Sequence, residues 1–169
     1  TEEFRTVAAR RGITLRVDVS GVEDDAVLIA DRDKMEHMYF NIMSNALKYT
    51  PDGGCITTTL LHHDHCYTLR IADTGKGIPT EELPHLFERF YQAKGAIGGT
   101  GIGLSLVKAY IDMHRGSVHA ESVEGKGTTF VIELPDSQPG YDPAKDAPAA
   151  TQAEKGLVDD NYIATDTTA

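Results

Sequence analysis

The stretch Gly95-Ala96-Ile97-Gly98-Gly99-Thr100-Gly101-Ile102-Gly103-Leu104-Ser105-Leu106 joins a glycine-rich loop to an apolar pattern with helical spacing. Glycine lets backbone N–H groups turn toward a ligand at close range, because no side chain stands in the way. The first N–H groups of a helix lack partners within the helix, and the helix dipole is positive at that end. We therefore expect a phosphate group to bind here, although glycine-rich loops are also common on protein surfaces.

The composition narrows the class of protein. A chain of 169 residues with 40% hydrophobic content predicts one domain with a packed core. The net charge is −10, and seven acidic against two basic residues from Asp136 onward supply −5 of it. This balance argues against nucleic acid as a partner. The chain has no apolar run long enough to span a bilayer, so we expect no direct membrane contact. Its two cysteines suit a cytoplasmic location, whether or not the parent protein is membrane-anchored.

Apolar periodicity outlines a series of strands and helices. Asp33 and Glu36 precede a helical run in the spacing of a capping box, with Asp33 as the N-cap. The apolar face of that helix holds Met35, Met38, Tyr39, Ile42, Met43 and Ala46. We expect further helices over 80–87 and from the glycine-rich stretch to 113. The expected strands cover 13–19, 27–30, 55–61, 66–72, 117–122 and 128–134. This order predicts an α+β fold, a two-layer α/β sandwich with a mixed sheet and helices on one face.

Composition also divides the chain into three parts. Residues 13–135 carry the patterns of the folded domain, while 1–12 read as the end of a preceding helical hairpin or linker. From 136 to 169 the chain is rich in Pro, Ala, Asp and Thr and poor in large apolar residues. Such a segment buries too little surface to offset its ordering entropy, so we expect a flexible acidic linker or tail.

The helix after Asp33 carries a polar stripe beside its apolar face. Asn41, Asn45 and Lys48 follow one another at i, i+4 and i+7, so they share one side of the helix. Two amide oxygens suit Mg²⁺, which prefers oxygen ligands, and a lysine can meet a phosphate. The alternative for these three residues alone is an ordinary solvent-exposed polar face.

Two further motifs lie between the strands and the last helix. Asp73 ends a strand and opens the sequence DTGKGI, so its carboxylate can accept a hydrogen bond from an exocyclic amine such as that of adenine. An ordinary turn that begins with aspartate is the alternative. Phe87 and Phe90 flank Glu88 and Arg89, and the two rings can pin one end of a mobile lid to the core. A short amphipathic turn is the alternative there.

Taken in order, these motifs resemble the ATP-binding catalytic domain of sensor histidine kinases, of the superfamily shared with gyrase and the heat-shock chaperones. Residues 41–50 (NIMSNALKYT) look like its N box and 73–77 (DTGKG) like its first glycine box. Residues 87–90 (FERF) resemble the F box, and 99–104 (GTGIGL) resemble the second glycine box. Residues 125–130 (GKGTTF) look like its terminal strand. The resemblance spans roughly residues 13–135.

The resemblance implies a role for each matching residue. Asn41, Asn45 and Lys48 are the implied catalytic residues, with Asn45 and Asn41 as Mg²⁺ ligands. Asp73 is implied to bind the adenine amine with support from Thr128, beside Gly75 and Gly77, while Tyr49 packs along the base. Residues 79–98 are implied to form the lid, which we call by that name below. The implied phosphate contacts are Lys48, Arg89, Lys94, Gly99, Thr100, Gly101, Ile102, Gly103 and Leu104.

The resemblance also implies the reaction and the partners. The implied activity is transfer of the ATP γ-phosphoryl group to a histidine on a separate helical hairpin of the parent protein, which is a dimer there. A response-regulator receiver domain is the second implied partner. None of the seven histidines has the acidic, helical context of the acceptor, so we expect that hairpin to lie outside this chain. The alternative is an ATP-binding switch module that gates partner contacts or phosphatase activity without phosphotransfer.

The run His62-His63-Asp64-His65-Cys66 has the composition of a metal site. Adjacent ligands in one turn seldom converge on a single ion, and no second cluster completes a tetrahedron. We therefore predict a polar hairpin tip.

Overall fold

The computed structural model describes residues 2–23, 25–94, 96 and 98–137. Its centre is a five-stranded sheet in the order β1-β2-β3-β5-β4. β1 pairs in parallel with β2, and the other neighbouring pairs are antiparallel, so the sheet is mixed as predicted. The strands are β1 (Thr14–Gly21), β2 (Cys55–His63), β3 (Cys66–Asp73), β4 (Ser117–Val123) and β5 (Gly127–Pro135).

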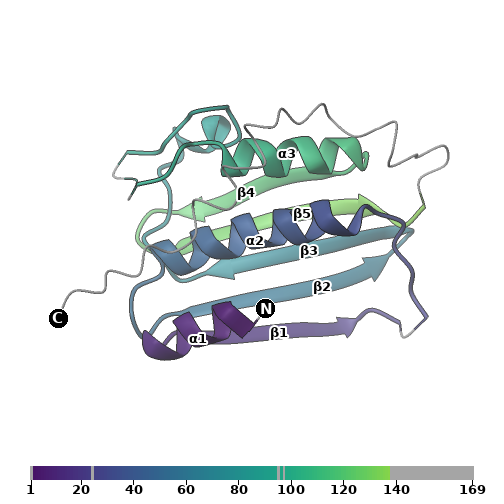
Figure 1. The fold of residues 1–169 in the computed structure, drawn as a ribbon, viewed down its shortest axis with the longest axis horizontal. Helices are drawn as coiled ribbons and strands as arrows, with labels where there is room; N and C mark the ends of the chain where they lie inside the picture. The colour runs from purple at the N-terminus through teal and green to yellow at the C-terminus, as the bar shows by residue number, and fades with distance from the viewer. Residues whose placement is uncertain (1, 24, 95, 97, 138–169) are drawn as a thin grey trace.

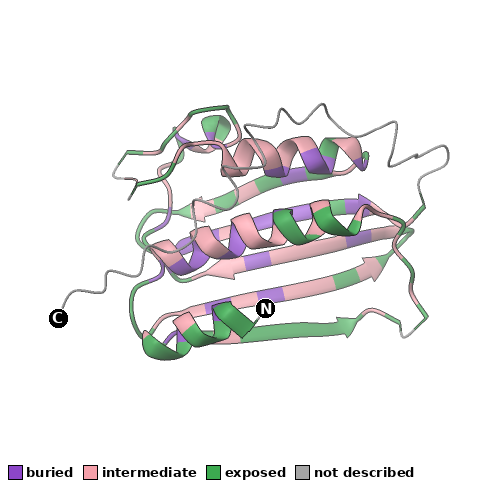
Figure 2. Cartoon of the chain, in the orientation of Figure 1, coloured by how far each residue is buried: buried purple, intermediate pink, exposed green. Residues whose placement is uncertain are grey.

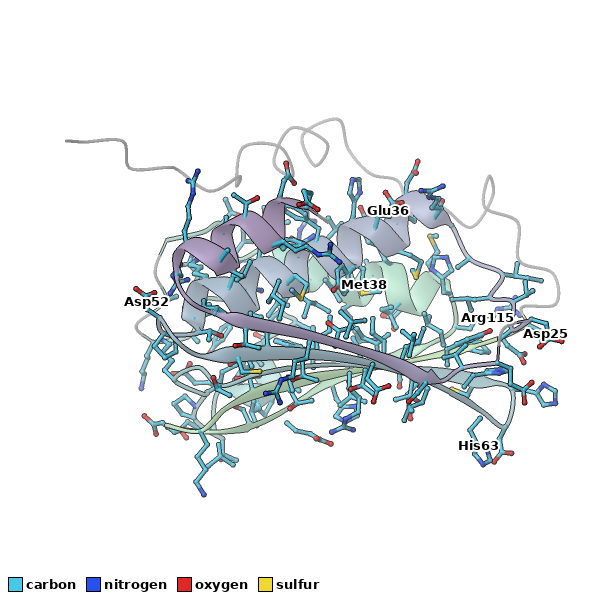
Figure 3. The ribbon with its side chains drawn as sticks, turned by 90° about the horizontal axis from the view of Figure 1, so that it is seen from below. Asp25, Glu36, Met38, Asp52, His63 and Arg115 are labelled. Carbon is cyan, nitrogen blue, oxygen red and sulfur yellow. The ribbon has the colours of Figure 1, made fainter. Side chains whose placement is uncertain are left out.

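The helices cover one face of this sheet and leave the other face open (Figures 1 and 3). They are α1 (Glu2–Arg10), α2 (Arg32–Tyr49) and α3 (Gly103–Met113). α2 lies over the middle of the sheet, with α1 above β1 on one side and α3 above β4 and β5 on the other (Figure 1). The predicted two-layer sandwich is therefore confirmed. Among the described residues, no helix combines the length and the apolar character that crossing a bilayer requires.

The core lies between the helical layer and the sheet (Figure 2). α2 buries Met38, Ile42, Met43, Ala46 and Leu47, whereas Met35 and Tyr39 of the predicted face are only partly buried. Ile56, Ile71 and Ile132 cover this face from the strands. Phe4 and Ala8 of α1 are buried in the same cluster, so α1 is an integral part of the helical layer. The assignment of residues 1–12 to a preceding hairpin stays a prediction, and the part of the predicted tail from 138 onward lies outside the described residues.

Three local predictions are wrong. Residues 27–30 form a loop, in which Val27 is 70% exposed and Ile29 54% exposed. The N-cap of α2 is Asp31, whose side chain accepts the Lys34 N–H, so Asp33 lies within the first turn. Within 80–87 only a short 3₁₀ turn forms, η1 (Leu83–His85), because the available N–H groups bond three residues back instead of four.

The edge strand β1 is less buried than its alternating pattern predicts. Ile13, just before it, is buried, but Val17 is 68% exposed and Val19 is 54% exposed. α1 lies over only the first part of β1 (Figure 1), and the exposed fractions of the two valines show that the described structure covers them only in part.

The histidine-rich run is a hairpin tip, as predicted. Asp64 and His65 both have positive φ, 49° and 62°, as a two-residue turn between antiparallel strands requires. In the part of the chain that the structure describes, no group of three or more His, Cys, Asp or Glu side chains can hold a metal ion.

Candidate functional site

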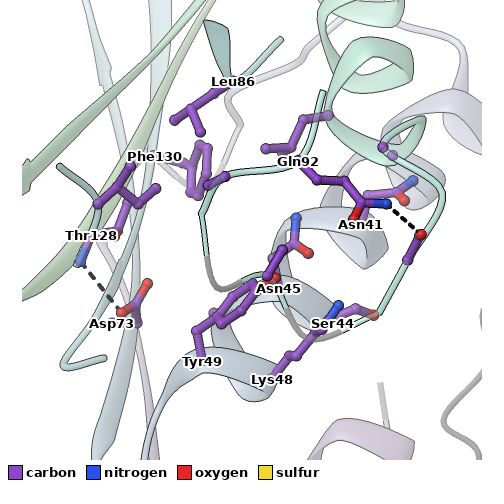
Figure 4. A pocket seen from close by; sticks show the side chains of 18 of the residues that line it. Asn41, Ser44, Asn45, Lys48, Tyr49, Asp73, Leu86, Gln92, Thr128 and Phe130 are labelled. Carbon is purple, nitrogen blue, oxygen red and sulfur yellow. Dashed lines mark hydrogen bonds between the residues drawn. The ribbon is translucent and has the colours of Figure 1, made fainter. Parts of the chain in front are cut away.

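A cavity of about 930 Å³ lies between the polar face of α2, the end of β3 and the segment that leads into α3 (Figure 4). Most of the residues singled out in the sequence line it. Gly75 and Arg89 do not. The predicted residues around the cavity are Asn41, Asn45, Lys48, Tyr49, Asp73, Gly77, Lys94, Gly99, Thr100, Gly101, Ile102, Gly103, Leu104 and Thr128.

Asp73 is held at the cavity wall by backbone donors. Its Oδ1 accepts the Gly75 N–H at 2.8 Å. The same oxygen accepts the Thr128 N–H at 3.3 Å (Figure 4). Burial raises the pKa of the Asp73 carboxyl, and these two hydrogen bonds only partly oppose the rise. Thr128 therefore supports Asp73 through its backbone, while its hydroxyl contacts Ser122 Oγ at 3.0 Å.

Packing against neighbouring backbone also requires glycine in the two glycine boxes. Gly77 has a φ of +69°, and a Cβ there would lie 2.2 Å from the Val123 carbonyl oxygen. Gly101 has a φ of +70°, and its Cβ would lie 2.7 Å from the Phe90 carbonyl carbon. Close approach to a ligand is therefore not the sole reason for glycine here. A Cβ on Gly75 would lie 2.7 Å from both Asp73 Oδ1 and the Tyr49 carbonyl oxygen.

The polar stripe of α2 forms the floor of the cavity. Asn41 Nδ2 donates to the His37 carbonyl at 2.9 Å, and a Cβ on Gly103 would lie 2.8 Å from Asn41 Oδ1. The amide oxygen of Asn41 is thus directed toward the first turn of α3. Lys48 Nζ donates to the Gly98 carbonyl at 2.8 Å. Ser44 lies on the same stripe and also lines the cavity. It was not predicted as a site residue, although its place beside Asn45 on the helix could have indicated it.

Two cations flank the Tyr49 ring at the end of α2. Lys48 Nζ lies 5.2 Å from the ring centroid, and Lys76 Nζ lies 5.0 Å from it. Both lysines also line the cavity.

The two aromatic residues of the F box behave differently. The Phe87 ring packs edge-on against Phe130, with centroids 6.3 Å apart, so Phe87 anchors the lid to the core as expected. Phe90 is 68% exposed and has a φ of +64°, so the expectation that it also pins the lid is wrong. The Arg89 guanidinium lies 5.6 Å from the Phe90 ring. The sequence also missed Gln92, whose Nε2 donates to the Gly99 carbonyl at 2.6 Å.

The cavity elements fall within one known family. The family of histidine kinase-, DNA gyrase B- and HSP90-like ATPases matches residues 30–138, which include α2, β3, the lid and α3. The chain belongs to this family.

Curated relatives narrow the family to sensor kinases. The chain is 38% identical over 117 residues to sensor histidine kinase WalK of Bacillus subtilis, an alignment that covers 66% of this chain and 19% of WalK. It is 41% identical over 138 residues to histidine protein kinase DivJ of Caulobacter vibrioides, covering 76% of this chain and 23% of DivJ. The chain therefore spans about a fifth of the length of these relatives.

Solved structures agree with this placement. Mycobacterial sensor histidine kinase MprB is 29% identical with a TM-score of 0.67, covering 79% of this chain and 91% of MprB. The catalytic domain of histidine kinase ThkA is 26% identical with a TM-score of 0.68, covering 81% of this chain and 94% of that domain. The chain thus corresponds to the ATP-binding catalytic domain of a sensor histidine kinase.

Proposed function

We propose that the cavity binds ATP with Mg²⁺ and that the domain transfers the γ-phosphoryl group to a histidine on a separate helical hairpin of its parent protein. A receiver domain of a response regulator is the proposed next acceptor. The observation that carries the proposal is the convergence of the Asp73 carboxylate and the polar stripe of α2 on one cavity. Full-length histidine kinase ShkA, solved in complex with AMPPNP, shares this fold at a TM-score of 0.69 with 26% identity, covering 80% of this chain and 29% of ShkA.

The adenine end of the proposed site is built around Asp73. Both backbone N–H groups that bond this carboxylate do so at Oδ1, so an exocyclic amine in the cavity can donate to Oδ2. That hydrogen bond would favour the ionised carboxylate, which burial disfavours in the free domain. Tyr49 offers a flat apolar ring for the base to pack along.

The phosphate end is built from the stripe of α2, the glycine segment and the start of α3. Lys48 and Lys94 line this end and supply positive charge. α3 begins at Gly103, so its first N–H groups point toward the same space. The bond from Lys48 to the Gly98 carbonyl is one that a phosphate oxygen can replace. Arg89, a lid residue that does not line the cavity, is the further proposed phosphate contact.

The amide oxygens of Asn45 and Asn41 fit a hard cation. Asn41 directs its amide oxygen toward the phosphate end, because its Nδ2 is used by His37. When bound, Mg²⁺ would neutralise charge on the phosphates, and the chain's own residues would fix the geometry. Positioning and charge stabilisation are the main demands of phosphoryl transfer, and Asn41, Asn45 and Lys48 meet them without a covalent step on this domain.

The test is transfer of radiolabel from ATP to an added phosphoacceptor hairpin. We expect labelled, acid-labile histidine on the hairpin and negligible label on this chain. Asn45→Ala should abolish transfer and weaken Mg²⁺-dependent nucleotide binding, whereas Glu36→Ala, on the exposed side of α2, should change neither. ATP binding without transfer would instead support the switch module, and no ATP binding would overturn the proposal.

A further inference from the structure

A buried carboxylate at the edge of the cavity has no part in the motifs or in the proposed chemistry. Glu82 is only 4% exposed and precedes the 3₁₀ turn η1. Burying an ionised carboxylate is costly unless hydrogen bonds compensate the charge. The partners of Glu82 therefore indicate what the residue does.

Those partners lie in the second half of the lid. The two carboxylate oxygens of Glu82 accept the Lys94 backbone N–H at 3.2 and 3.0 Å. Burial, then the negative charges of Glu82 and Glu88 and a hydrogen bond to Glu82, raise the pKa of the Tyr91 hydroxyl. Glu82, which precedes the F box, thus forms hydrogen bonds with the first and the last residue of the stretch 91–94, which follows it.

This stretch presents side chains to the cavity. Gln92 and Lys94 both line the cavity, and Gln92 donates to the Gly99 carbonyl. Just before the stretch, the Phe90 N–H donates to the Gly101 carbonyl at 2.9 Å. Residues 90–94 are therefore fixed on one side by Glu82 and on the other by the second glycine box.

We propose that Glu82 is a positioning residue for the phosphates of the bound nucleotide. Its carboxylate holds residues 91–94 so that Gln92 and Lys94 face the phosphate end, and Glu82 itself does not touch the nucleotide. The inference rests on the proposed ATP function. Because the adenine end is built separately around Asp73, loss of Glu82 acts on binding of the phosphates and leaves binding of the base unchanged.

The test compares Glu82→Ala with Glu82→Gln and with Glu36→Gln as an exposed control. In Glu82→Ala, NMR without nucleotide should show faster hydrogen exchange at the Lys94 amide. Calorimetry should show ATP affinity lower by about tenfold, the loss expected for one hydrogen bond to a charged group. The affinity for AMP, which lacks the outer phosphates, should stay at the wild-type value. Glu82→Gln keeps an acceptor oxygen and should fall between wild type and Glu82→Ala in both measurements.

Each outcome is decisive. Unchanged Lys94 exchange in Glu82→Ala overturns the hydrogen-bonded role, and equal losses for ATP and AMP reduce Glu82 to a structural residue. If Glu82→Ala does not fold, the test uses Glu82→Gln. The proposal is then overturned if Glu82→Gln shows wild-type hydrogen exchange at the Lys94 amide and a wild-type ratio of ATP to AMP affinity. If the wild-type chain does not bind ATP, the proposed function fails, and Lys94 exchange still decides whether Glu82 holds the lid.

Discussion

Asp73 and Asp136 stand at opposite ends of the paired strands β3 and β5 and have opposite electrostatics. Asp73 ends β3 at the cavity, where burial raises the pKa of its carboxyl against two backbone donors. Asp136 follows β5, beside the other end of β3. Burial alone would raise the pKa of Asp136, but hydrogen bonds from His65, His62 and Ser137 hold it below the ordinary value.

The geometry around Asp136 explains the difference. Its Oδ2 lies 3.3 Å from His62 Nε2 and 3.1 Å from His65 Nδ1, and its backbone N–H donates to the His65 carbonyl. This carboxylate is satisfied by the fold itself. Asp73 is not compensated to the same degree, so a ligand that donates a hydrogen bond gains most there. The comparison shows how the carboxylate that we propose to bind a ligand differs from one whose partners all belong to the fold.

The largest expected effect is that of Asp73→Asn on nucleotide binding. The amide offers an amine where an acceptor is needed, so we expect ATP affinity to fall by about 1.5–3 kcal/mol, as for a hydrogen bond to a charged group. The free domain should unfold at the same temperature or higher, because the neutral side chain avoids the cost of burying a charge. Calorimetry and thermal unfolding measure the two effects, and wild-type affinity in Asp73→Asn contradicts the adenine assignment.

The same substitution at Asp136 should have the reverse profile. Asp136→Asn removes the charge that two imidazoles contact, so we expect a lower urea midpoint for unfolding and an unchanged ATP affinity. Urea unfolding and calorimetry on the same preparation test both statements. A drop in ATP affinity as large as that of Asp73→Asn would show that the two ends of the strand pair are not independent.

Acidification should change the contributions of Asp73 and Asp136 to the free energy of unfolding in opposite directions. Because the folded pKa of Asp73 is raised, its contribution to the free energy of unfolding increases as pH falls through that pKa. Because the folded pKa of Asp136 is lowered, its contribution is present above the ordinary value of 3.8 and is lost as pH falls through the folded value.

Nucleotide binding gives the more direct readout of this difference. ATP affinity should weaken as Asp73 takes up its proton, since the protonated carboxyl no longer accepts from the base through an ionised oxygen. The phosphates of ATP titrate as well, so the measurement is the difference in pH profile between wild type and Asp73→Asn. Parallel profiles would contradict the role of Asp73.

The smallest expected effect distinguishes the two imidazoles at Asp136. The His62 side chain is 22% exposed and stacks on Tyr67 with centroids 4.3 Å apart, whereas the His65 side chain is 90% exposed. His62→Ala should therefore lower the urea midpoint more than His65→Ala, because it removes packing as well as a hydrogen bond. Equal midpoints for the two variants would mean that the ring stacking contributes nothing.

These two carboxylates also show what the sequence could reveal. Asp73 could be predicted as a cavity residue because a strand end and a glycine turn are local patterns, and the polar stripe of α2 follows from helical spacing alone. The partners of Asp136 lie 74 and 71 positions away, so no local pattern pairs them. Glu82 was missed for a related reason. Its partner is the backbone N–H of Lys94, and because almost every residue type carries a backbone N–H, the sequence gives no sign of the contact.

The wrong elements have equally physical causes. Residues 27–30 are apolar but find no neighbouring strand in the described structure, and Ile29 instead donates its N–H to the Asp136 carbonyl. Asp31 precedes α2 and Asp33 lies in its first turn, and only the contact with the Lys34 N–H decides which of the two caps the helix. Phe90 has the residue type of a core anchor, but it lies in a turn with a positive φ and its side chain is exposed.

The parallel pairing of β1 with β2 has a kinetic consequence. Thr14 pairs with Cys55, about 40 positions later, and α2 lies within the intervening crossover. Closing such a long loop costs chain entropy before any contact repays it, so pairings of this kind form slowly. During synthesis, α2 leaves the ribosome before β3 does, so until β3 emerges its polar stripe has no opposing carboxylate. The nucleotide cavity therefore matures late, because a helix made early must wait for Asp73 at the end of a strand made after it.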